Sequence, residues 1–284
     1  MKKNILPLIL LASVIGSQPV FAQSSTGKLN LLKGQQLAVQ TSINSITTLD
    51  VMGQSQEIIS DAKGVFTVQV KDKKTTGYLV GSTLTRMQVK GNVMGQVFDF
   101  DSDNKKDRDS SEMGNLVKSQ LGTEKEIEMN ENGVITNNAA KANNDADNMM
   151  SMAGNIAGSG DMSNASADAF MVLPKNAQTG TTWTDSIITP GIKTYRNFTI
   201  TGMQQNIATV ALTGTQNTNT TVSQMGMEVA VSMLLKLNGQ IKVDAVSGIV
   251  VEKTYTADGS GTADASGMSI PITTKITSST NVQK

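Results

Sequence analysis

The stretch QMGMEVAVSMLLKL, residues 224–237, places an apolar side chain at every second position. A period of two residues is typical of a β-strand with one buried face. The dipeptide Asn238-Gly239 follows directly, and Asn-Gly is favoured in two-residue hairpin turns. The sequence therefore predicts a long strand, a tight turn at Asn238-Gly239 and a return strand that carries Ile241 and Val243.

The remaining C-terminal sequence repeats this pattern of strands and turns. Ser247-Gly248 predicts a turn into a strand over residues 249–255. The Gly, Ser and Ala residues of 258–267 predict a loop, and residues 269–278 predict a last strand. Pro271 lies inside that last strand and has no N–H to donate, so it predicts an edge position in the sheet.

The N-terminal third also alternates. Residues 29–100 form short alternating runs separated by Gly or polar residues, which is typical of an antiparallel meander. Phe66, Val68 and Val70 fall on one face of one run, and Phe98 and Phe100 share a face of a later one. We expect these faces to contribute to the core.

The middle of the chain shows helical spacing instead. Residues 111–121 place Met113, Leu116, Val117 and Leu121 on one helical face before Gly122, which predicts a short helix. Asn132-Gly133 then predicts a small hairpin. Residues 138–158 carry Ala, Met and Ile at spacings of four and three, which predicts a second helix, although their Asn and Gly content also fits a partly disordered loop.

These patterns together predict a mainly β protein. The predicted architecture is a curved antiparallel sheet or unclosed β-barrel with one or two inserted α-helices. We expect one domain over residues 23–284 with its helical insertion at about 111–158.

Residues 1–22 have the layout of a secretory signal peptide. Lys2 and Lys3 precede an apolar run, and Val20-Phe21-Ala22 provides the small residues before a cleavage site. The run is too short to span a bilayer. We therefore expect cleavage after Ala22, no transmembrane anchor afterwards, and a periplasmic or secreted protein.

Composition excludes several kinds of chemistry. The chain has no Cys and no His, and its 24 basic residues balance its 24 acidic ones. Thiol nucleophiles, serine triads with an imidazole base, and zinc or haem sites built on Cys or His are excluded. A neutral chain also lacks the basic surface that nucleic acids require. We expect no cofactor, no nucleic-acid partner and no enzymatic activity.

Two acidic clusters remain as candidate sites. Residues 99–104 resemble the start of a calcium loop, but Asn104 and Ser110 stand where an EF-hand has Gly and Glu. This difference favours a polar loop, and we predict no metal site. No spacing brings together two of the carboxylates that glycoside hydrolysis would need, those of Glu124, Glu126, Glu128 and Asp185.

Methionine suggests a different kind of site. The chain has 16 Met and only six Phe and one Trp. Flexible thioethers adapt to irregular apolar ligands, and they also fill cores that are poor in aromatic residues. On the first interpretation, the predicted ligand-binding residues are Met149, Met152 and Ile156 on the middle helix and Met227 and Met233 on the long strand.

Three patches of sequence carry a resemblance to a known family. They are LLKGQ at residues 31–35, the segment 174–183 that ends in Gly-x-x-Trp, and GQIKVDAVSG at residues 239–248. Together they resemble an uncharacterised family of secreted proteins from Bacteroidota. The resemblance implies an architecture similar to the unclosed β-barrels of periplasmic lipoprotein carriers (LolA-like), in which a helical cover closes an apolar cavity that holds acyl chains. No ligand-binding residue carries over from those carriers.

Two functions follow from these observations. The first is an exported, non-enzymatic binding protein that holds a lipid or other hydrophobic ligand in its half-barrel. The alternative is a structural or protein-interaction module of the cell envelope, with an envelope protein as partner and no small-molecule ligand. The two differ in whether the inner face of the sheet holds a ligand or a filled core.

Overall fold

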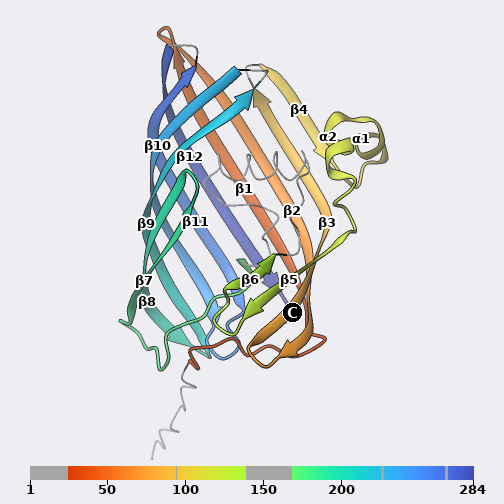
Figure 1. The fold of residues 1–284 in the computed structure, drawn as a ribbon, viewed down its shortest axis with the longest axis vertical. Helices are drawn as coiled ribbons and strands as arrows, with labels where there is room; N and C mark the ends of the chain where they lie inside the picture. The colour runs from red at the N-terminus through yellow and green to blue at the C-terminus, as the bar shows by residue number, and fades with distance from the viewer. Residues whose placement is uncertain (1–24, 94, 139–167, 225–226, 266–267) are drawn as a thin grey trace, which may run out of the picture.

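The computed structural model describes residues 25–93, 95–138, 168–224, 227–265 and 268–284. Within them the chain forms twelve strands and two short helices (Figure 1). In chain order these elements are β1 (Gln36–Val51), β2 (Gln54–Lys74), β3 (Gly77–Val93), β4 (Gln96–Asp101), α1 (Lys105–Ser110), α2 (Glu112–Val117), β5 (Glu124–Asn130), β6 (Ile135–Asn138), β7 (Thr182–Thr189), β8 (Ile192–Gln204), β9 (Ile207–Gln224), β10 (Met227–Asp244), β11 (Val250–Ala265) and β12 (Met268–Gln283).

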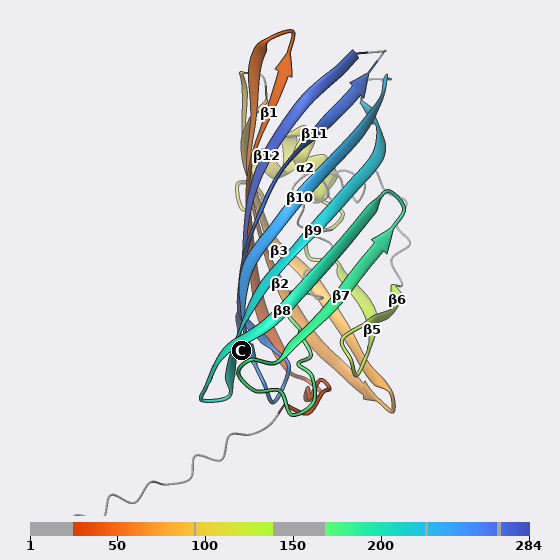
Figure 2. The ribbon, with the colours of Figure 1, turned by 90° about the vertical axis from the view of Figure 1, so that its left-hand side faces the viewer.

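The strands make one curved antiparallel sheet in the order β6-β5-β3-β2-β1-β12-β11-β10-β9-β8-β7. β4 pairs with β3 beyond the end of β5, so β3 has two successive neighbours on one side. Among the described strands, β6 and β7 are the two edges and do not pair with each other. Figure 2 shows the long strands curving along the full height of the molecule. The predicted unclosed antiparallel sheet with inserted helices is confirmed.

Side-chain alternation explains why the sheet has a definite inner and outer face. In β1, Leu37, Val39 and Ile43 are buried, whereas Gln36 and Gln40 are exposed. Burying one such aliphatic side chain stabilises the fold by about 1.5–3 kcal/mol. A slip of one residue in the pairing would turn all of them to water, so the alternation fixes the register.

Two segments close one end of the curved sheet, which we call the closed end. Residues 25–35 and 168–181 cross it in Figure 1. The Leu29 N–H donates to the Glu131 carbonyl at 2.7 Å, and the Tyr78 hydroxyl donates to the Leu29 carbonyl at 2.8 Å. Phe170 forms an isolated bridge with Ile249, and both are buried. We call the opposite end, where β1 turns into β2, the rim end.

The predicted turn at Asn238-Gly239 is wrong, because β10 continues through both residues. Gly239 lies opposite Tyr255 of β11, and a Cβ atom on Gly239 would lie 2.6 Å from the Tyr255 Cβ. This glycine makes room for an aromatic neighbour and does not form a turn. The other two predicted turns, at Asn132-Gly133 and Ser247-Gly248, are confirmed.

The predicted loop over residues 258–267 is also wrong, because β11 extends to Ala265. Gly259 and Gly261 alternate with outward polar residues and lie beside the large side chains of β10. A Cβ on Gly259 would lie 2.6 Å from Leu235 Cδ2, and one on Gly261 would lie 2.8 Å from Met233 Cγ. The small residues are therefore part of the sheet.

The last strand, β12, is longer than predicted and lies between β1 and β11, so the edge position predicted from Pro271 is wrong. The ladder between β1 and β12 ends at the pair Leu49–Ile272. Pro271 is the next residue of β12. The missing N–H therefore falls at the residue where the pairing with β1 stops.

The helical region differs in detail from the prediction. The helix expected over residues 111–121 is α2 and spans only Glu112–Val117, with the Ser111 hydroxyl accepting from the Gly114 N–H at 2.8 Å. α1 precedes it and was not predicted. Its N-cap is Asn104, which accepts from the Lys106 N–H. The helix predicted over residues 138–158 lies outside the described residues, apart from Asn138 at the end of β6.

The close contacts of Gly261 generate a stability prediction. A Cβ at this position would lie 1.9 Å from the Ser232 carbonyl oxygen, so Gly261→Ala forces the two strands apart. We expect it to lower the free energy of unfolding by about 1–3 kcal/mol in urea titrations. Gly202→Ala is the matched control, because no atom lies within 4 Å of its added Cβ. Equal stability of the two variants would contradict the assigned role of Gly261.

Candidate functional site

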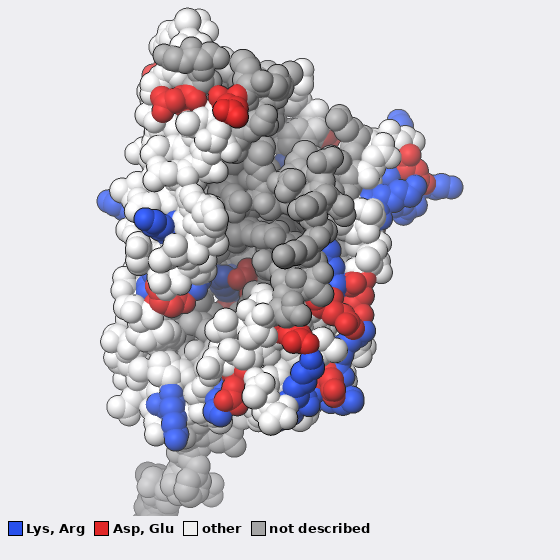
Figure 3. Space-filling model, in the orientation of Figure 1, with Lys and Arg blue, Asp and Glu red and all other residues white. Residues whose placement is uncertain are grey.

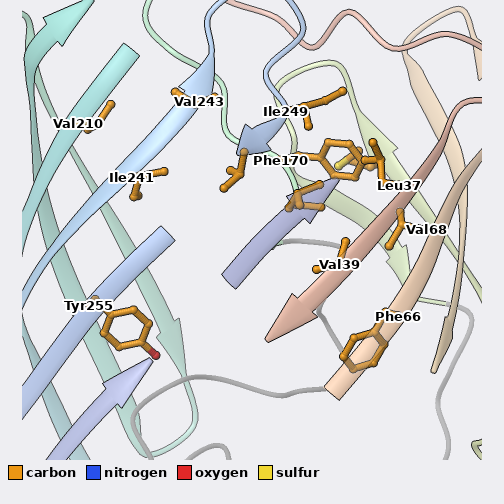
Figure 4. Packing of buried hydrophobic residues seen from close by; sticks show 14 of the residues in the cluster. Leu37, Val39, Phe66, Val68, Phe170, Val210, Ile241, Val243, Ile249 and Tyr255 are labelled. Atoms are coloured by element: carbon orange, nitrogen blue, oxygen red, sulfur yellow. The ribbon is translucent and has the colours of Figure 1, made fainter. Parts of the chain in front are cut away.

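The inner face of the sheet is the candidate site, because it is the one concave surface built by all the long strands. Towards the closed end this surface is aliphatic and aromatic. Figure 4 shows side chains from β9 and β10 on one side of the interior and from β1 and β2 on the other. The buried members of this apolar floor are Leu37, Val39, Phe66, Val68, Val70, Val80, Val210, Ile241 and Val243.

Hydroxyl and amide side chains form a second zone on the same face, further towards the rim end. Thr47 and Thr274 lie opposite each other on β1 and β12 with their Oγ1 atoms 2.8 Å apart. On the same face but towards the β7 edge, the Thr194 hydroxyl of β8 donates to Gln216 Oε1 of β9 at 3.2 Å. We call this zone the hydroxyl band, and its buried members are Thr41, Ser45, Thr47, Thr194, Gln216, Thr218, Thr274, Ser278 and Thr280.

The hydroxyl band can serve as a polar lining. Each hydroxyl has one proton to donate and two lone pairs to accept with, so a hydroxyl that bonds to its neighbour keeps capacity for another partner. Thr41 and Thr280, 3.4 Å apart at Oγ1, mark its lower limit. Below this pair the inner positions of β1 are occupied by Val39 and Leu37.

Two ion pairs also face the interior. Lys253 of β11 donates to Asp168 at 2.5 Å, and its side chain is only 14% exposed. Near the β7 edge, Arg196 donates to both carboxylate oxygens of Asp185, from Nε at 2.7 Å and from Nη2 at 2.6 Å. Each of these two pairs is neutral as a unit. The sequence offered no signal for the Lys253 pair, because its partners are 85 residues apart.

An aromatic stack adjoins the second pair. The rings of Trp183 and Phe198 stack with centroids 5.1 Å apart, and the Arg196 guanidinium lies 5.5 Å from the Phe198 centroid. Trp183 is half-buried and packs against the core. This contact anchors the edge strand β7 to the rest of the sheet.

The predicted ligand-binding residues divide into two groups. Met149, Met152 and Ile156 lie outside the described residues. Met227 is the first residue of β10, at the rim end. Met233 faces the interior, half-buried against the core and opposite Gly261.

The carboxylates considered for glycoside hydrolysis are not brought together. Glu124 and Glu126 both bond to Lys71, and Glu128 bonds to Lys74. Asp185 lies near the opposite edge of the sheet. The two hydrogen bonds from Lys71 to its glutamates raise the pKa of that lysine.

Basic side chains neutralise the acidic loop that resembles a calcium site. Asp101 accepts from Arg86 at 2.7 Å and from Gln88 at 2.8 Å, and Arg86 also pairs with Asp103 at 2.9 Å. The Arg86 hydrogen bond is the largest cause that lowers the pKa of Asp101 to about 2. In the part of the chain that the structure describes, no group of three or more acidic residues is placed to hold a metal ion.

The helices that the structure describes are also too short to serve as membrane spans. None of them is long and apolar enough to cross a bilayer.

Comparisons with known proteins identify a family whose function is unknown. The sequence profile of a family described as a family of unknown function (DUF6263) matches residues 75–250. No curated protein matches the chain. The match agrees with the expected uncharacterised domain, whereas the expected origin in Bacteroidota and the likeness to lipoprotein carriers stay predictions.

Two solved structures are similar over most of their length. DynF from the dynemicin biosynthesis pathway of Micromonospora chersina is 8% identical, with 92% of this chain and 86% of DynF covered and a TM-score of 0.24. The COG4313 outer membrane channel from Pseudomonas putida F1 is 9% identical, with 90% of this chain and 98% of the channel covered and a TM-score of 0.24. At these scores neither structure supports an inference about function.

The Arg86–Asp101 contact predicts a specific pH dependence. Because the pKa of Asp101 falls from 3.8 to about 2 on folding, its contribution to stability is present above about pH 4 and is lost as the pH falls towards 2. Asp101→Asn should therefore lower the urea midpoint near neutral pH, and the difference from the wild type should vanish near pH 2.

Asp99→Asn is the control for this prediction, because Asp99 pairs with Lys90 on the surface with both side chains more than half exposed. It should change the midpoint little at any pH, since exposed ion pairs contribute little. A difference between Asp101→Asn and the wild type that stays constant down to pH 2 would contradict the account.

Proposed function

This chain belongs to the DUF6263 family, whose function is unknown, and we propose from its geometry that it is an exported, non-enzymatic binding protein for a lipid or other hydrophobic ligand. The observation that carries the proposal is the concave inner face, which is apolar towards the closed end and further towards the rim end combines hydroxyls with Ile43, Ile272 and Ile276. A long apolar molecule with a polar part matches both zones of such a surface.

The contrast between the two faces supports the proposal. The outward residues of β12, such as Thr273, Lys275 and Thr277, are polar and exposed, whereas the inward Ile272 and Ile276 are buried. The apolar surface is thus directed to the interior. The segments that cross the closed end limit access from that side.

One observation supports the alternative, a structural or protein-interaction module of the cell envelope. Ile276 is 0% and Thr280 1% exposed, and hydroxyls such as those of Thr47 and Thr274 bond to each other. Such mutual satisfaction is what a filled core requires. Only a direct search for a bound molecule separates a filled core from an occupied one.

Export is part of the proposal. The secretory layout of residues 1–22 and the resemblance to lipoprotein carriers both support a protein that works outside the cytoplasm, in the periplasm or beyond the cell. A soluble binding protein in that compartment gives apolar molecules a protected route through water.

Native mass spectrometry of the protein purified from its own host tests the proposal. We expect a population whose mass exceeds that of the chain by an extractable acyl or other apolar molecule, and we expect delipidated protein to bind a fluorescent fatty acid. Ile276→Trp, which fills the inner face, should weaken that binding by about tenfold or more, equivalent to about 1.4 kcal/mol.

Thr277→Trp is the matched control. It adds the same side chain to the adjacent, outward-facing position of β12 and should leave the affinity unchanged. A bare mass together with no binding of the fluorescent probe by the wild type would rule out the ligand-binding function and leave the structural module.

A further inference from the structure

The ion pair of Lys253 and Asp168 lies inside the curved sheet, where a charged side chain is costly to bury. Lys253 shares the inner face of β11 with the buried Tyr255 and Ala257, because alternate residues of a strand point the same way. Its side chain is 14% exposed, the lowest value among the lysines whose ion pairs the structure describes. Lysine is seldom buried this far unless its charge is paired.

The ammonium group of Lys253 can donate three hydrogen bonds and accept none. Among the described residues its one hydrogen-bond acceptor is Asp168, at 2.5 Å. Its other recorded contact is with the face of the Tyr255 ring, 5.5 Å from the ring centroid. Two of its three protons therefore have no acceptor among these residues, although the group lies on the inner face.

The neighbours of Lys253 across the sheet mark the boundary between apolar and hydroxyl side chains. Lys253 lies opposite Ile241 of β10 on one side and opposite Thr280 of β12 on the other. Thr280 in turn lies opposite Thr41 of β1, the pair that ends the hydroxyl band. Figure 4 shows Ile241 and Tyr255 on the same side of the interior. One ammonium group and two hydroxyls thus form a row of donors across three neighbouring strands.

Apolar side chains follow on the same face. Ala257 lies four residues along β11 from Lys253 and opposite Ile276 of β12, and both are buried. At a rise of 3.3 Å per residue, this is a distance of about 13 Å along the strand. An acyl chain whose head group lies at Lys253 can therefore run along β11 and β12 past Ile276.

We propose that Lys253 is the head-group site of the hydrophobic ligand, and that this head group is the carboxylate of a fatty acid. The inference rests on the proposed binding function and names the class of its ligand. The ammonium group already holds one carboxylate, that of Asp168, and its remaining protons can hold a second. The hydroxyls of Thr280 and Thr41 can donate to the same oxygens. An uncharged head group gains less, because hydrogen bonds to charged groups are the stronger ones.

Asp168 sets how strongly the fatty acid is held. Its side chain is 33% exposed, and its carboxylate shares the ammonium group with that of the ligand. Repulsion between the two carboxylates opposes binding. Asp168→Asn removes the charge but keeps an oxygen that accepts from Lys253, so this variant should bind lauric acid about threefold to tenfold more tightly than the wild type.

Isothermal titration calorimetry of delipidated protein with lauric acid and with 1-dodecanol tests the assignment, because the two ligands share a chain length and differ in the head group. We expect the wild type to bind lauric acid about tenfold more tightly than 1-dodecanol. In the double variant Lys253→Met with Asp168→Asn this preference should disappear, while the affinity for 1-dodecanol stays the same. Replacing both partners avoids leaving an unpaired charge inside the sheet.

Lys242→Met with Glu252→Gln is the matched control. This ion pair joins the same two strands one residue away from the Ile241–Lys253 pair, and both of its side chains are at least 40% exposed. The substitutions remove the same charges from the outer face. The preference for lauric acid should therefore remain.

Three results would overturn the assignment. Equal affinity of the wild type for the two ligands would show that no charged group holds the head group. A preference that survives in the Lys253 variant would place the head group elsewhere, and weaker binding of lauric acid by Asp168→Asn would make the ion pair structural. In each case binding of 1-dodecanol leaves the proposed function standing. Failure of the wild type to bind either ligand would instead remove the proposed function together with the site.

Discussion

The structure depends on how closely neighbouring strands approach each other on the inner face of the sheet. Where large side chains of one strand lie against the backbone of the next, only glycine fits. At Gly239, Gly259 and Gly261 an added Cβ would lie within 2.6 Å of an atom of the neighbouring strand. Glycine has no Cβ atom to clash there, so the side chains of Tyr255, Leu235 and Met233 can pack over these three positions. These glycines therefore let the large side chains of the neighbouring positions pack against the sheet.

Without disulfides, the sheet is held by burial, by its strand ladders and by side-chain hydrogen bonds. The pairing of β9 with β10 runs unbroken from Met227–Gln224 to Asp244–Ile207, and aliphatic side chains back much of its length. The closed end gains further support from segments that are distant in sequence, as when Ser25 bonds to Pro174 and Ala177. The described turns of the rim end have exposed apolar residues in place of such support. The closed end is therefore the better supported of the two.

The predictions from sequence were correct where a local pattern determines the structure. They were wrong where a contact with a neighbouring strand determines whether the chain turns or continues. Alternation gave the β class and placed Phe66, Val68 and Val70 on one buried face. The dipeptide Asn-Gly illustrates the limit. It turns the chain at Gly133, which has a φ of 79°, but not at Gly239, where the neighbouring Tyr255 requires a glycine within a strand. The Gly- and Ser-rich end of β11 resembles a loop for the same reason. In the candidate site, alternation alone indicated that Met233 faces inwards, whereas the ion pair of Lys253 with Asp168 could not be foreseen from two residues so far apart.

Hydrogen–deuterium exchange of the backbone amides tests most directly whether small residues extend the strands through these regions. The account predicts that amides of residues 238–243 and 259–264 exchange as slowly as those in the centre of β12, because they belong to the same ladders. Exchange of residues 238–239 and 258–265 at the rate of free loops would show two turns in their place and would contradict the curved sheet described here.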